Sequence, residues 1–147
     1  MQIRSAETAG FCFGVERAVS LAEQTAKSCA SAVTLGPIIH NRHVVERFEA
    51  MGLREIARAE DAQPGQTVVI RAHGIPVSEQ QTLAARGAKL VDATCPFVKK
   101  IHVIARQAEE AGRHLLIIGT PTHPEVTAIA SYSSDAHVFQ TAEALES

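Results

Sequence analysis

The chain carries the same arrangement of a cysteine and a histidine twice. Cys12 precedes His40 by 28 residues, and Cys95 precedes His123 by the same 28 residues, so the two pairs are offset by 83 residues. Further identities occur at this offset: Gly36 with Gly119, Val15 with Val98, Ala22 with Ala105, and Gln24 with Gln107. Because the repeat duplicates a thiol and an imidazole as well as apolar positions, it predicts two similar units with a site built between them.

Composition limits the class of protein. A chain of 147 residues with 46% hydrophobic residues can build one domain or two small ones around a true core. The net charge of −2 and the single Tyr without any Trp argue against a nucleic-acid partner. The longest apolar runs are too short to cross a bilayer, and the first residues lack the apolar core of a signal peptide. Three cysteines without an export signal predict a cytoplasmic location, where thiols serve metals or chemistry.

Apolar periodicity alternates between strands and helices along the chain. This alternation predicts an α/β fold with parallel sheets covered by helices. Ser78 is the expected cap of one helix, and the Cys95-Pro96 corner is the expected boundary between a first unit, 1–95, and a second unit, 96–147. Strands are expected at 2–6, 32–35, 67–70, 89–91 and 114–118, and helices at 14–27, 41–51, 78–86, 96–111 and 125–131.

Two of the three cysteines lie at the start of expected helices. The free N–H groups and the positive end of the dipole at a helix start favour thiolate over thiol, so Cys12 and Cys95 are candidate metal ligands. A zinc site made of these two thiols and a nearby histidine would satisfy the same pattern. Cys29 lies at a helix end among small residues, and we interpret it as structural.

Three histidines follow expected strands in similar contexts. His40, His73 and His123 should meet at one edge of the parallel sheets, where their ring nitrogens and backbone N–H groups would suit a phosphate or a diphosphate. Glu125 follows His123 by two residues, and two roles are open for it: a proton donor, or a first-turn acid that complements the helix dipole. The remaining histidines are interpreted as structural: His43, His102, His114 and His137.

Several of these residues fall inside motifs that resemble one family. The segment from Gly10 to Val19, GFCFGVERAV, resembles the opening motif of the LytB/IspH family. Four further motifs match in the same order and extend the resemblance over most of the chain: His40-Asn41-Arg42 with Val44-Val45, Ala72-His73-Gly74, Asp92-Ala93-Thr94-Cys95-Pro96 with Val98, Lys100 and His102, and His123-Pro124-Glu125-Val126.

The resemblance implies a reductase of the non-mevalonate isoprenoid pathway. Such an enzyme removes the hydroxyl group of 4-hydroxy-3-methylbut-2-enyl diphosphate and forms isopentenyl and dimethylallyl diphosphates. It implies similar α/β units around a [4Fe–4S] cluster held by three cysteines, of which Cys12 and Cys95 are two. By the same resemblance His40, His73 and His123 bind the diphosphate, while Glu125 with His123 serves proton delivery, and a ferredoxin or a flavodoxin donates electrons.

The chain also departs from the family pattern. The family's third cluster cysteine and the segments that complete its diphosphate site belong to a third unit, which is not expected within these residues. Cys29 is no substitute, because it lies at the wrong end of the first helix. Thr120 and Ala128 replace a His and a Gly of the family motifs. We therefore expect little activity from the chain alone. We expect it to be either a non-catalytic anion- or metal-binding fragment or a part completed by a C-terminal half or by self-association.

Overall fold

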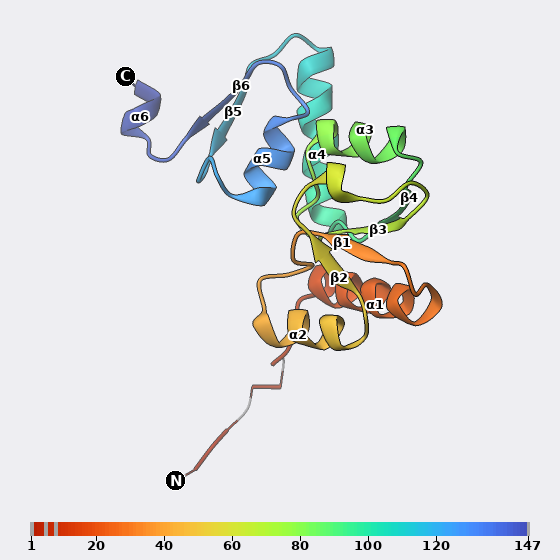
Figure 1. The fold of residues 1–147 in the computed structure, drawn as a ribbon. Coiled ribbons are helices and arrows are strands. Elements are labelled where there is room, and N and C mark those ends of the chain that lie inside the picture. The colour runs from red at the N-terminus through yellow and green to blue at the C-terminus, as the bar shows by residue number, and fades with distance from the viewer. Residues whose placement is uncertain (1, 5, 8, 147) are drawn as a thin grey trace.

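Parallel strands and covering helices alternate through the structure, which is a computed structural model that describes residues 2–4, 6–7 and 9–146 (Figure 1). The predicted α/β fold is confirmed. The helices are α1 (Phe13–Ser28), α2 (Arg42–Ala50), η1 (Ala59–Asp61), α3 (Val77–Ala85), α4 (Pro96–Glu110), α5 (Pro124–Ala130) and α6 (Glu143–Glu146). The strands are β1 (Val33–Leu35), β2 (Arg54–Ile56), β3 (Thr67–Ile70), β4 (Lys89–Asp92), β5 (Leu115–Ile118) and β6 (Ala136–Phe139).

The first four strands form one parallel sheet in the order β2-β1-β3-β4, covered by helices on both faces. Neighbouring residues of β3 point to opposite faces, as the pleat requires. Val69 packs with α1 and α2 in one apolar cluster, whereas Val68 and Ile70 pack with α3 and η1 in a second cluster. Burial on both faces explains why β3 reads as an unbroken apolar run in the sequence.

The second sheet, β5-β6, repeats the register of β1 and β2. Val33 pairs with Arg54 in the first sheet, and the residues 83 positions further on, Leu116 and His137, pair in the second. The hydrogen bond that follows the strand is repeated as well: Gly36 N donates to Ile56 O at 3.0 Å, and Gly119 N donates to Phe139 O at 2.8 Å. The repeat seen in the sequence therefore extends to the backbone of a whole strand-helix-strand unit.

Three local predictions are wrong. Residues 2–4 and 6 do not form the strand expected at 2–6, whose residue 5 lies outside the described residues. Helix α3 begins at Val77 with Pro76 as its N-cap, so Ser78 lies inside the helix and is not its cap. Strands β2 and β6 were not expected. In β2 the exposed Arg54 and Glu55 lack the apolar run of a buried strand, because β2 forms the edge of its sheet.

Helix α4 joins the two sheets, and it packs against α5 and β5. The division into units at 1–95 and 96–147 stays a prediction, although each range holds one of the two sheets. Several large apolar side chains of the second unit are exposed: Phe97, Ile101, Val103 and Ile104 on α4, and Leu116 and Ile118 on β5. In the part of the chain that the structure describes, no helix has the length and apolarity needed to cross a membrane.

Candidate functional site

Three imidazole rings meet beyond the carboxyl ends of the parallel strands. His40 follows β1, His73 follows β3, and His123 follows β5 as the N-cap of α5. The ring centroid of His73 lies 4.7 Å from that of His40 and 5.6 Å from that of His123, and the other two centroids lie 6.2 Å apart. We call these three residues the histidine triad. The structure thus brings together the three histidines that the sequence singled out.

Backbone hydrogen bonds hold the loops of this site in a fixed relation. Ala72 N donates to Ile38 O at 3.2 Å, which ties the loop of His73 to the loop of His40. Cys95 N in turn donates to Ala72 O at 2.9 Å. The loops that carry His40, His73 and Cys95 are therefore joined by backbone hydrogen bonds that continue the first sheet beyond its strands.

The His73 ring is the least solvated member of the triad. The pKa of His73 is lowered from 6.5 to about 4, chiefly by burial and to a lesser extent by the neighbouring His40, His123 and Arg71. Its Nδ1 atom is buried and has no hydrogen-bond partner among the described residues. A buried polar atom without a partner is costly, so the site is suited to a ligand or water that supplies one.

The tautomer of His123 follows from a contact at the start of α5. Glu125 N donates to His123 Nδ1 at 3.2 Å, so that nitrogen accepts and the proton of the neutral ring lies on Nε2. His123 therefore presents a donor to a ligand. The half-buried Glu125 lies in the first turn of α5, where it complements the helix dipole, and its role as a proton donor stays a prediction.

The two candidate thiols occupy equivalent positions at helix starts. Cys12 is the N-cap of α1 and is exposed, and Cys95 is the N-cap of α4 and is half-buried. A Cβ atom on Gly14 would lie only 2.4 Å from Cys95 Sγ, so the sulfur rests against the first turn of α1, which follows Cys12 directly. Two thiols at the positive ends of two helices form a suitable donor set for a metal or an iron–sulfur cluster, and the missing Cβ leaves room for Cys95 there.

Arg17 also fixes this junction, although no specific role was predicted for it from the sequence. Its guanidinium donates to Thr94 O at 3.2 Å and to Asp92 O at 3.4 Å, which ties α1 to the segment before Cys95. The feature of the sequence that could have identified Arg17 is its place within the opening motif, between Gly10 and Val19. Cys29 lies at the other end of α1, which is about 24 Å long, and its sulfur contacts Thr67 Oγ1 at 3.5 Å.

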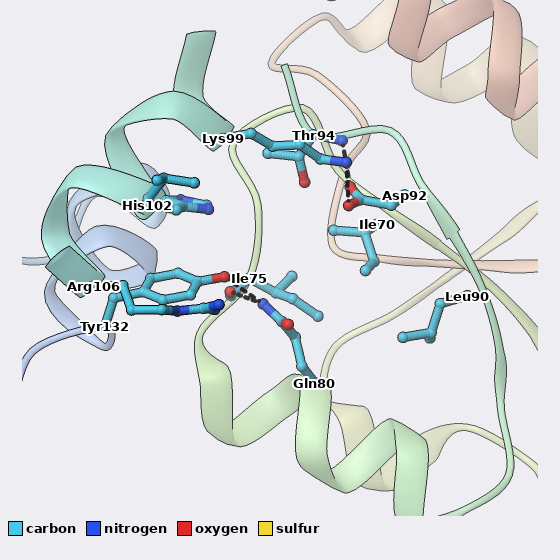
Figure 2. A pocket seen from close by; sticks show the side chains of 11 residues that line it. Ile70, Ile75, Gln80, Leu90, Asp92, Thr94, Lys99, His102, Arg106 and Tyr132 are labelled. Carbon is cyan, nitrogen blue, oxygen red and sulfur yellow. Dashed lines mark hydrogen bonds and ion pairs between the residues drawn. The ribbon is translucent and has the colours of Figure 1, made fainter. Parts of the chain in front are cut away.

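A separate cavity of about 320 Å³ lies between α3, β4 and α4 (Figure 2). Lys99 Nζ pairs with Asp92 at 2.6 Å on one side of it, and the His102 ring stacks on Tyr132 at 4.6 Å on another. His102 is buried and packs against Gly74, the residue after His73. Its ring therefore contacts the loop that carries one member of the triad. None of the triad or cysteine side chains lines the cavity.

The parallel sheets with covering helices define this chain as an α/β protein, in which His40, His73, Cys95 and His123 follow the carboxyl ends of strands. The sequence model described as LytB protein matches residues 3–147, which is nearly the whole chain. The chain belongs to the LytB family.

Two curated relatives carry the same name. A 4-hydroxy-3-methylbut-2-enyl diphosphate reductase from Solidesulfovibrio magneticus is 44% identical over 153 residues, covering 99% of this chain and 54% of that protein. The reductase of Aquifex aeolicus is 44% identical over 128 residues, which cover 86% of this chain and 44% of that protein. The chain therefore spans about half the length of the curated relatives it matches.

Solved structures agree with the sequence comparisons. One is an (E)-4-hydroxy-3-methyl-but-2-enyl diphosphate reductase described as the terminal enzyme of the non-mevalonate pathway. It matches with a TM-score of 0.80 and 41% identity over 97% of this chain and 53% of the other. The E-1-hydroxy-2-methyl-but-2-enyl-4-diphosphate reductase of Plasmodium falciparum matches with a TM-score of 0.89 and 26% identity, over 95% of this chain and 45% of the other.

Proposed function

We propose that this chain contributes one side of the active site of a 4-hydroxy-3-methylbut-2-enyl diphosphate reductase. The observation that carries the proposal is the convergence of His40, His73 and His123 beyond the carboxyl ends of the strands, with His73 Nδ1 buried and without a hydrogen-bond partner in the described part of the chain. Charge-assisted donors of this kind favour the oxygens of a phosphate group. The names of the relatives supply the substrate, a diphosphate ester with an allylic hydroxyl group.

Each residue has a distinct role in this proposal. The triad binds the diphosphate, with the Nε2 proton of His123 as one donor, and Glu125 beside it delivers a proton to the departing hydroxyl group. Cys12 and Cys95 are two of the ligands of a [4Fe–4S] cluster. Such a cluster, when bound, accepts and releases electrons one at a time. A ferredoxin or a flavodoxin is the proposed electron donor, and a C-terminal half or a second copy supplies the remaining ligand and substrate contacts.

A second candidate function is metal binding without catalysis. One ligand nitrogen from each triad histidine lies within 4.8 Å of the other two, so the triad has the donor set of a three-histidine zinc site. In that case Zn²⁺ and diphosphate would compete for the same imidazoles. The competition provides a direct way to separate the two functions.

Calorimetric titration of diphosphate into the chain tests the anion site. We expect binding that His123→Ala weakens at least tenfold, because one of three converging donors is lost. His43→Ala removes an exposed histidine of α2 and is the matched control. Binding that is unaffected by His123→Ala, or that appears only when Zn²⁺ is present, would contradict the proposal.

The cluster and the reaction need separate measurements. After anaerobic reconstitution we expect iron and sulfide to bind and to be lost in Cys12→Ser and Cys95→Ser but retained in Cys29→Ser. We also expect dehydroxylation with a one-electron reductant to be weak for the chain alone. It should rise on mixing with a separately expressed C-terminal half of a relative.

A further inference from the structure

A second cluster of metal-ligating side chains lies at the opposite edge of the β5-β6 sheet. His114 directly precedes β5, Asp135 directly precedes β6, and His137 is the second residue of β6. These residues lie at the amino ends of the strands, whereas His123 follows the carboxyl end of β5, and a strand of four residues is about 13 Å long. The cluster is therefore distinct from the histidine triad.

Asp135 links the two imidazoles of this cluster. One of its oxygens contacts His137 Nε2 at 2.7 Å, and the other contacts His114 Nδ1. One nitrogen from each ring and one carboxylate oxygen lie within 4.8 Å of one another. Around a tetrahedral ion with bonds of about 2.0–2.2 Å, ligand atoms are roughly 3.3 Å apart. Small rotations of the exposed side chains are enough to reach that spacing.

The backbone around Asp135 is held by the rest of the fold. Leu115 N donates to Asp135 O at 3.0 Å, which links the starts of the two strands. Glu109 of α4 accepts hydrogen bonds from Ser133 Oγ at 3.0 Å and from Ser134 N at 2.9 Å, and so it fixes the turn that precedes Asp135. A ligand set on two paired strands and a braced turn loses little conformational freedom when it binds an ion.

We propose that His114, Asp135 and His137 form a binding site for a divalent transition-metal ion such as Zn²⁺. Two imidazole nitrogens and one carboxylate oxygen are a donor set for Zn²⁺, Co²⁺, Ni²⁺ or Fe²⁺, and they are a poor set for Mg²⁺ and Ca²⁺, which take oxygen ligands. The side chains remain 77%, 44% and 54% exposed, in chain order, which leaves the other coordination positions open to water. The ion replaces the ring protons that now face Asp135.

The site matters for any metal analysis of this protein. It would take up one ion per chain during iron reconstitution, without sulfide and without the cysteines. Iron content alone would then overstate the amount of cluster. Only the iron-to-sulfide ratio would separate iron bound at this site from iron in a cluster.

Zn²⁺ titration of the metal-free chain at about pH 7.5, followed by calorimetry and by NMR of the imidazole rings, tests the proposal. We expect the ring signals of His114 and His137 to shift on binding. Asp135→Asn and His137→Ala should each weaken one binding event at least tenfold. His43→Ala is the control for a single exposed histidine, and His123→Ala should leave this event in place.

The wild-type spectra keep the test decisive even if a variant folds poorly. Ring signals of His114 and His137 that stay unchanged at saturating Zn²⁺ would overturn the proposal. Equal shifts with Mg²⁺ would overturn it too, because they would report only ionic screening of Asp135. His137→Gln keeps a hydrogen-bond donor near Asp135, and a folded His137→Gln protein with wild-type Zn²⁺ affinity would also refute it.

Discussion

Proton uptake should accompany the binding of diphosphate to the histidine triad. In the free protein the pKa of His73 is about 4, because burial and the neighbouring histidines disfavour the imidazolium. The negative charge of a bound diphosphate stabilises the imidazolium form of His73 and so raises that pKa. If it returns to 6.5, linkage makes binding about 30-fold tighter at pH 5.0 than at pH 7.5. The ring is only half-buried, and solvent screening reduces the expected gain to about tenfold.

Calorimetry at several pH values measures the gain in diphosphate affinity at low pH. Comparison with His73→Asn isolates the part of that gain that comes from the His73 imidazole. Diphosphate titrates over the same pH range, but its own protonation affects both proteins equally, so the ratio of the two affinities reports the imidazole. Repeating the titration near pH 5.5 in buffers with different ionisation enthalpies counts the protons directly, and we expect between about half a proton and one proton. An affinity ratio that is flat between pH 7.5 and 5.0, with no proton uptake, would refute the role of His73.

Three further outcomes follow from the structure. Gly14→Ala places a Cβ 2.4 Å from Cys95 Sγ, so iron and sulfide incorporation should fall several-fold while the thermal unfolding temperature changes little. Gly74→Ala combines a φ of +77° with a Cβ 2.6 Å from His102 Cε1, and urea unfolding should show a loss of about 2 kcal/mol or more; a loss below about 0.5 kcal/mol would contradict the packing. Ile118→Glu should shift sedimentation toward the monomer, because it places a charge on the exposed apolar face of β5.

The sequence predicts the elements that the structure buries and the site that those elements carry. Strand β3 (Thr67–Ile70) buries Val68, Val69 and Ile70, and its apolar run predicts a buried strand without any knowledge of the strands that pair with it. Parallel strands place their carboxyl ends along one edge, so histidines that follow such strands were expected to meet. The meeting of His40 and His73 is thus a consequence of sheet topology that can be predicted along the chain, whereas His123 follows a strand of the second sheet and reaches them through the packing of the two sheets.

What the sequence does not predict depends on pairing between distant segments. Strand β6 was not expected, and without its pairing to β5 nothing placed His114 beside Asp135 and His137. The approach of Cys95 to Gly14 likewise depends on how α4 docks against α1, and no local pattern encodes that docking. Local periodicity specifies elements, whereas tertiary pairing decides which polar side chains become neighbours.

The common register of the two strand-helix-strand units makes them modular. Val33–Ile56 and 116–139 have equal length, begin and end in paired strands, and close with equivalent hydrogen bonds from Gly36 and Gly119. An exchange of one segment for the other keeps the register between the two strands of the unit, whereas the pairing of β1 with β3 has no counterpart for β5 among the described strands. What would change is the set of side chains, from a strand buried on both faces to one that is half-exposed. The scaffold and its surface chemistry can therefore vary independently within one chain.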